Sequence, residues 1–156
     1  MTVEALSELF KQYGRTLGSA ESFTGGQFAA SITAIPGASK FFKGSLVTYA
    51  TEEKVKILGI PQQRVDQYGV VSHEICGDMA MRSRFILGSD YSIAFTGNAG
   101  PTAMEDKPVG EIYIGVTAYT TTQVFKYLLN GSREEIVRQA LQLGYDHLEI
   151  MLKSFK

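Results

Sequence analysis

Residues 15–32 place a strand pattern, a glycine turn and a helix pattern in immediate succession. The segment from Arg15 to Glu21 has the pattern of a short strand, Gly25-Gly26 supplies a tight turn, and a helix is expected from Gln27 onward. Proteins with α/β folds place their ligands at such junctions, at the carboxyl ends of strands. The junction therefore predicts an α/β fold and marks a first candidate site.

The remaining elements alternate in the same way. The sequence predicts an amphipathic helix ending near Gly14, a helix capped by Thr51, a short helix with Pro61 at its first position, and a longer helix from the cap Ser72 to the stop signal Gly88. Strands are expected over residues 44–50 and 90–96, and an antiparallel hairpin over residues 111–119 and 123–129. Ser132 and Glu135 have the spacing of a capping box at the start of the last helix.

This order of elements predicts one domain, residues 1–156, built as a three-layer α/β/α sandwich over a mixed, mostly parallel sheet. The chain has 15 basic and 16 acidic residues, so it lacks the excess of cations that binds nucleic acid. One cysteine and two scattered histidines offer neither an internal disulfide nor the spacing of metal ligands. No signal sequence or membrane-length apolar run is present, which indicates a cytoplasmic protein. We expect neither a metal nor a cofactor.

Two hydroxyl side chains, Ser22 and Thr24, stand beside Gly25 and Gly26 where the predicted helix begins. Backbone amides at such a position can face an oxyanion or a phosphate. A plainer interpretation is that one hydroxyl caps the helix and the glycines make the turn. Farther along, Tyr49 lies at a strand end and Lys54 one helical turn beyond it, where a desolvated lysine could act as a base toward a serine. A solvated surface lysine is the alternative.

A third candidate segment, Thr96-Gly97, opens the longest irregular run of the chain, which extends to Gly110. Long ordered loops are often functional, so we expect this run to form a wall of the site, although a plain turn fixed by Pro101 is the alternative. Lys107 and Arg133 could each neutralise a phosphate or could be surface charges. His73, His147 and Cys76 are interpreted as structural, Cys76 as a buried small apolar residue.

Several short motifs then follow one another in a specific order. They are Ala-Glu-Ser22-x-Thr-Gly-Gly, Pro-Gly-Ala-Ser-x-Phe-Phe-x-Gly-x-x-x-Thr-Tyr49, Lys54 with Leu58-Gly59, Gly69-x-Val-Ser72, Thr96-Gly97-x-Ala-Gly-Pro101, Lys107-Pro108-x-Gly110 and Gly131-x-Arg133. In this order they resemble the C-terminal domain of the CinA (competence/damage-inducible) family, over nearly the whole chain. Phe23 departs from the cysteine of many relatives, and residues 102–106 lack the glycines common there.

The resemblance implies hydrolysis of nicotinamide mononucleotide to nicotinate mononucleotide and ammonia, in pyridine nucleotide salvage. Ser22 would be the nucleophile, Lys54 its general base and Tyr49 an assisting hydroxyl. Thr96 and Arg133 would lie in the substrate site, with Thr24, Gly25, Gly26 and Gly97 as further substrate contacts. Oxyanion-stabilising amides would come from residues 24–26 or from the Gly97 loop.

The resemblance also implies a homodimer or higher homo-oligomer. The family occurs fused behind a nucleotide-pyrophosphatase domain too, and we expect a stand-alone form here. Three alternatives stay open: a non-catalytic nucleotide- or phosphate-binding module, a competence-related interaction module, and an amidase of another carboxamide. Ammonia release, compared among nicotinamide mononucleotide, its riboside and free nicotinamide, would discriminate among them.

Overall fold

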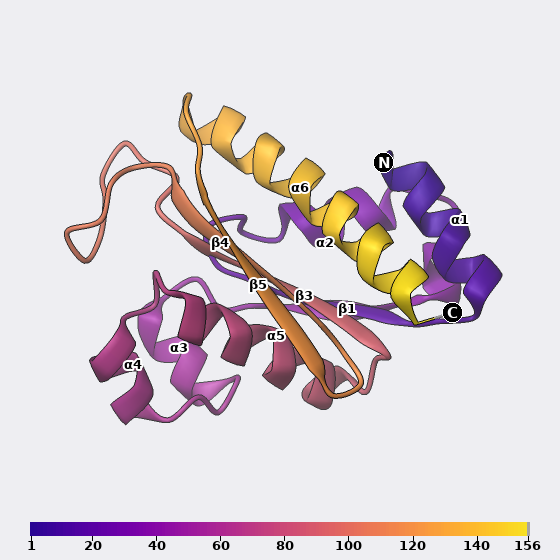
Figure 1. The fold of residues 1–156 in the computed structure, drawn as a ribbon, viewed down its shortest axis with the longest axis horizontal. Coiled ribbons are helices and arrows are strands. Elements are labelled where there is room, and N and C mark those ends of the chain that lie inside the picture. The colour runs from indigo at the N-terminus through magenta and orange to yellow at the C-terminus, as the bar shows by residue number, and fades with distance from the viewer. Residues whose placement is uncertain (156) are drawn as a thin grey trace.

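A five-stranded sheet forms the centre of the computed structural model, which describes residues 1–155 (Figure 1). In spatial order the strands are β2 (Phe42–Val47), β1 (Leu17–Glu21), β3 (Tyr91–Gly97), β4 (Glu111–Ala118) and β5 (Thr121–Leu128). β1 pairs in parallel with β2 and β3, whereas β4 pairs antiparallel with β3 and β5. The predicted mixed sheet is confirmed, and the hairpin of β4 and β5 supplies its antiparallel part.

Helices cover both faces of this sheet, which confirms the predicted α/β/α sandwich. In Figure 1, α1 (Val3–Tyr13), α2 (Gln27–Thr33) and α6 (Arg133–Ser154) lie above the sheet, and α3 (Thr51–Lys56), α4 (Gln62–Tyr68) and α5 (His73–Leu87) lie below it. A short 3₁₀ turn, Ala38–Lys40, precedes β2. Among residues 1–155, no helix has the length and apolar character needed to cross a membrane.

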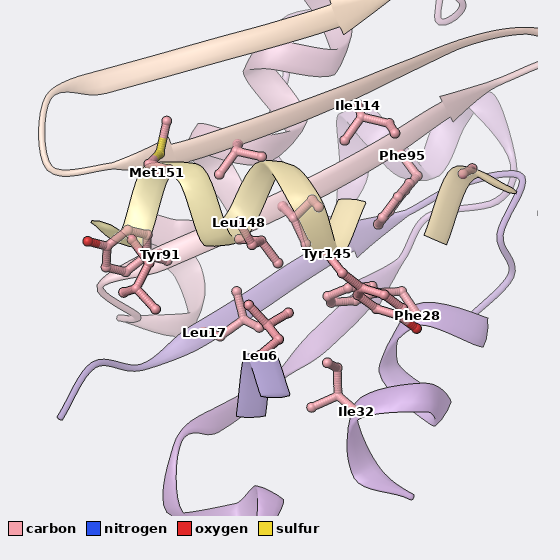
Figure 2. Packing of buried hydrophobic residues seen from close by; sticks show 14 of the residues in the cluster. Leu6, Leu17, Phe28, Ile32, Tyr91, Phe95, Ile114, Tyr145, Leu148 and Met151 are labelled. Atoms are coloured by element: carbon pink, nitrogen blue, oxygen red, sulfur yellow. The ribbon is translucent and has the colours of Figure 1, made fainter. Parts of the chain in front are cut away.

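Alternation along the strands divides the buried apolar residues between the two faces. Ile93 and Phe95 of β3 belong to the cluster beneath α1, α2 and α6, whereas Ala94 between them belongs to the cluster beneath α4 and α5. Figure 2 shows the first cluster, in which Phe28 of α2 contacts both Phe95 of β3 and Tyr145 of α6. Burial on both faces explains why the consecutive residues Ile93, Ala94 and Phe95 of β3 are all apolar.

The helix caps test the predicted boundaries. Ser72 accepts a hydrogen bond from the Ile75 amide, Gly88 ends α5 in the left-handed conformation, and the capping box at the start of α6 is present, so these predictions are confirmed. The prediction that Thr51 caps α3 is wrong: Ala50 occupies the cap position and offers no side-chain hydrogen bond, and Thr51 is the first helical residue. Pro61 is likewise the cap residue of α4, one position before the helix.

β2 is displaced toward the N-terminus from the predicted residues 44–50. It ends at Val47, although the Thr48 amide still donates to the Glu21 carbonyl at 2.9 Å. Residues 48–50 therefore leave the sheet and turn directly into α3. Because β1, β2 and β3 are mutually parallel, the segments that follow their carboxyl ends meet at one edge of the sheet.

Candidate active site

A buried carboxylate fixes the turn that carries Ser22. Glu21 is fully buried at the end of β1, and its two oxygens accept five hydrogen bonds, from the Thr24 hydroxyl, the amides of Gly26, Phe28 and Ala29, and the Ser45 hydroxyl. Three of these donors are backbone amides at the start of α2, which have no acceptor within the helix and favour a negative charge beside them. Glu21 therefore ties together the end of β1, the start of α2 and the neighbouring strand β2.

Ser22 and Lys54 meet behind this turn. Lys54 Nζ lies 2.9 Å from Ser22 Oγ and donates to it, and the same amine donates to the Thr48 carbonyl at 2.6 Å and to the Tyr49 carbonyl at 3.4 Å. Lys54 is 1% exposed and Ser22 is 6% exposed. The alternative of a solvated surface lysine is therefore wrong, because α3 turns this side chain inward, under the end of β2.

Burial changes the acidity of Lys54. Desolvation lowers the pKa of its amine from 10.5 to about 8, and the negative charges of Glu105 and Glu52 oppose that shift. A pKa near 8 leaves about a tenth of the amines neutral at pH 7, and a neutral amine beside a serine hydroxyl can accept its proton. The pair thus has the geometry of a nucleophile and its base.

A pocket of about 150 Å³ opens over Ser22. Its lining residues come from the ends of the three parallel strands, the loop after β3 and the start of α6. They are Ser22, Phe23, Tyr49, Gly97, Asn98, Ala99, Thr102, Met104 and Arg133. A cavity of about this size holds a benzene-sized ring. The pocket can therefore accept one six-membered aromatic ring next to the Ser22 hydroxyl, while larger parts of a ligand must extend outward.

Tyr49 and Arg133 form the outer rim of the pocket. Both residues are exposed, and Arg133 donates to the Tyr49 hydroxyl at 3.2 Å and to the Gly100 carbonyl at 2.8 Å. The Tyr49 hydroxyl is thus engaged with Arg133, while the backbone carbonyl of Tyr49 contacts the Lys54 amine. This arrangement places a guanidinium at the mouth of the pocket, on the first turn of α6.

Four residues expected near the substrate do not line the pocket. Thr24 is fully buried and donates to Glu21, the Gly26 amide also donates to Glu21, and the Gly25 amide donates to the Ser22 carbonyl. Thr96 is 1% exposed and donates to the Val70 carbonyl at 2.7 Å. The suggestion that a hydroxyl caps α2 is wrong as well, because the cap residue is Gly26. These groups support the turn and the loop around the pocket.

The loop of residues 98–110 forms one wall of the pocket, in agreement with the expectation for this irregular run. It extends beyond the sheet at the left of Figure 1 and supplies Asn98, Ala99, Thr102 and Met104 to the lining. Asn98 organises it, since its side chain bonds to both the amide and the carbonyl of Met104 and to the Lys107 carbonyl. The sequence indicates the run as a wall of the site but gives no signal for the organising role of Asn98.

The backbone amides of Phe23 and Ala99 at the pocket are free to donate. Phe23 and Ala99 both line it, and neither amide donates to an acceptor within residues 1–155. The amide directly after a nucleophile is a common oxyanion donor. The predicted source of such donors in residues 24–26 is not supported for Gly25 and Gly26, whose amides are engaged elsewhere.

The remaining titratable candidates lie elsewhere. His147 stacks on Phe125 and contacts the Tyr127 hydroxyl at 2.5 Å, and His73 is exposed at the start of α5. Cys76 is fully buried in the second apolar cluster, and burial raises the pKa of its thiol. The structural interpretation of Cys76 agrees with this burial. Within the described residues, no three His, Cys, Asp or Glu side chains gather as metal ligands could.

Comparison with known proteins gives the family. The family model of the CinA C-terminal domain matches residues 1–152. The chain belongs to the CinA family. It is 38% identical over 151 residues to a protein of Bacillus pumilus that carries the name competence-damage inducible protein, with 97% of this chain and 36% of the relative covered. A relative with the same name in Streptococcus thermophilus is 45% identical over 130 residues, covering 83% of this chain and 31% of the relative.

Solved CinA structures share the fold along the whole chain. A CinA superfamily protein of Klebsiella pneumoniae superposes with a TM-score of 0.93 at 25% identity, with 99% of both chains covered. A CinA superfamily protein of Escherichia coli gives a TM-score of 0.88 at 29% identity, covering 94% of this chain and 88% of that one. The present chain spans about a third of the length of the curated relatives it matches.

Proposed function

We propose that this CinA domain is an amidase that hydrolyses the carboxamide of nicotinamide mononucleotide to nicotinate mononucleotide and ammonia. The 2.9 Å contact between Lys54 Nζ and Ser22 Oγ, beneath a pocket of ring size, carries the proposal. A serine paired with a buried amine is a known arrangement for acyl transfer. A cavity that accepts one aromatic ring suits a pyridine carboxamide, and Arg133 at its mouth suits a phosphate.

The acylation step uses only groups at this site. Neutral Lys54 accepts the hydroxyl proton as Ser22 Oγ attacks the carboxamide carbon, and the carbonyl oxygen becomes an oxyanion. The free amides of Phe23 and Ala99 are the candidate donors to that oxyanion. Lys54 then delivers its proton to the departing nitrogen, so that ammonia leaves and Ser22 is esterified.

Water completes the reaction. It attacks the Ser22 ester, its proton passes to Lys54, and collapse of the second tetrahedral intermediate returns that proton to Ser22 Oγ. The products are the carboxylic acid and a regenerated enzyme, so one water is consumed for each ammonia released. Since Lys54 must start neutral, kcat/KM should rise with pH and level off above about pH 8.

Ammonia release by variants tests the two assigned roles. Ser22→Ala should reduce turnover of nicotinamide mononucleotide by about 10⁴-fold or more, and Lys54→Met by about 10²- to 10⁴-fold, with both proteins folded. Lys56→Met is the matched control, because its side chain is 70% exposed on the same helix and should leave turnover unchanged. Turnover close to wild type in Ser22→Ala would contradict the proposal.

A substrate comparison tests the role of Arg133. If its guanidinium binds the phosphate, Arg133→Met should raise KM for the mononucleotide by about tenfold or more, the amount expected for a lost charge-assisted hydrogen bond. KM for the riboside, which has no phosphate, should change little. If KM rose equally for both substrates, Arg133 would instead act by supporting the loop through its contact with the Gly100 carbonyl.

A further inference from the structure

The connection between α4 and α5 is held by side chains from another part of the chain. Val70 and Val71 are buried, and side chains bond all four of their backbone polar groups. Glu105 accepts from the Val70 amide at 2.8 Å and from the Val71 amide at 2.9 Å. Thr96 donates to the Val70 carbonyl, and Lys107 donates to the Val71 carbonyl.

Glu105 is the central residue of this attachment. Its carboxylate fills the space beside Gly69 so closely that a Cβ there would lie 2.5 Å from Glu105 Oε1, and it pairs with Lys107 at 3.7 Å. Only 27% of its side-chain surface is exposed. The nearby residues Asn98, Ala99, Thr102 and Met104 line the pocket, so the contact that anchors the loop also fixes one wall of the site.

The same carboxylate acts on the Lys54 amine. The groups that face this amine are the Ser22 hydroxyl from β1 and the carbonyls of Thr48 and Tyr49 after β2. The charges that act on it are Glu105, from the loop, and Glu52, from its own helix, with Glu105 the stronger. Arg133 lies nearby, on the Tyr49 hydroxyl.

We propose that Glu105 is a positioning residue of the site, which locks the pocket wall onto the α4–α5 connection through its hydrogen bonds to the Val70 and Val71 amides. Its role in the reaction rests on the amidase proposed above. The charge favours the protonated amine, the form that delivers a proton to departing ammonia, and opposes the desolvation that favours the neutral base. One carboxylate thus anchors the loop wall, and its charge partly offsets the effect of desolvation on the Lys54 pKa.

The charge is tested by titrating Lys54 directly. In protein labelled with ¹³C at lysine Cε, with the Lys54 signal assigned by its loss in Lys54→Met, Glu105→Gln should lower the Lys54 pKa by roughly half a unit or more. Asp106→Asn is the control, because it removes the adjacent exposed charge at a backbone angle that asparagine tolerates (φ 55°). Equal pKa values in the two variants would overturn the charge role.

Two further variants separate charge from anchorage. Glu105→Asp keeps the charge, so its Lys54 pKa should stay nearer to wild type than that of Glu105→Gln; a value equal to that of Glu105→Gln counts against the charge role. In Glu105→Ala the Val70 and Val71 amides lose their acceptor and should exchange with solvent about tenfold faster or more, whereas unchanged exchange would overturn the anchoring role. Neither measurement needs a substrate, so failure of the amidase proposal would be seen separately, as absent ammonia release.

Discussion

Glu21 shows at the residue scale how a single buried group can organise a site. Its carboxylate has no access to solvent and depends on five donors, four from residues 24–29 and one from Ser45 of β2. A buried carboxylate is costly unless such donors satisfy it, and the donors are costly to leave without an acceptor. The residue next to it in sequence is Ser22, so the same network that stabilises the turn also orients the candidate nucleophile.

Replacing this carboxylate by an amide should therefore destabilise the fold. Glu21→Gln puts an NH₂ group among five donors, and we expect the free energy of unfolding to fall by about 2–4 kcal/mol in urea titrations. Glu8→Gln is the control, since that side chain is 72% exposed on α1 and its change should stay within about 0.5 kcal/mol. A Glu21→Gln protein as stable as the control would show that the network is not needed for stability.

How much of the site the sequence could predict depends on how far apart in the sequence the interacting residues lie. The glycine turn after β1 and the position of Ser22 are local features, and the sequence indicates both. Lys54 was assigned as the base through the family resemblance, because its side chain could equally have pointed to solvent. The role of Glu105 depends on partners 34 and 35 residues away, and no local pattern signals such contacts. Four of the five donors to Glu21 lie within eight residues of it, and only Ser45, 24 residues away, is brought to it by the pairing of β1 with β2.

At the scale of elements, two helical glycines show how closely the helices approach the sheet. Gly144 of α6 faces β3, where an added Cβ would lie 2.7 Å from Phe95 Cζ and 3.0 Å from Ile93 Cδ1. Gly77 of α5 faces β5, where the nearest atom, Val124 Cγ2, would lie at 3.4 Å, an ordinary contact distance. α6 thus packs against its face of the sheet with no room for a methyl group, and α5 has that room.

The two sites should respond oppositely to the same substitution. Gly77→Ala should stabilise the protein by about 0.5–1 kcal/mol, the usual gain in helix propensity. Gly144→Ala gains the same propensity but forces Phe95 and Ile93 aside, so a net loss of about 1–2 kcal/mol is expected. Thermal and urea unfolding of the pair would measure the difference, and a stabilised Gly144→Ala would mean that α6 can move away from β3 at little cost.

The boundaries of elements were predicted less well than their existence, for a physical reason. Ser72, Gly88 and the Ser132–Glu135 box end or begin helices through local hydrogen bonds and backbone angles, and the predictions based on them hold. The start of α3 is instead set where β2 leaves the sheet after Val47, which depends on its pairing with β1. A cap assigned from Thr51 alone could not account for that pairing.

At the scale of the whole molecule, Lys54 links stability to pH. The pKa of its amine is about 8 in the folded protein and near 10.5 when unfolded, so the unfolded chain binds more protons between these values. Stability contributed at this site therefore rises with pH across that window, and below about pH 8 the full cost of burying the amine is present. The candidate active site thus lowers the stability of the fold at neutral pH.

Removing the amine should abolish this dependence. Lys54→Met keeps the length of the side chain without its charge, and its stability relative to wild type should fall by roughly 2 kcal/mol between pH 7 and pH 10, as wild type recovers the cost. Other ionisable groups titrate in both proteins and cancel in the comparison, which urea unfolding at the two pH values would measure. The free energy of unfolding of the exposed-site variant Lys56→Met should differ from that of wild type by the same amount at both pH values. If the difference for Lys54→Met were also constant, the amine would titrate alike in the folded and unfolded states, and its neutral fraction near pH 7 would be only that of an ordinary lysine.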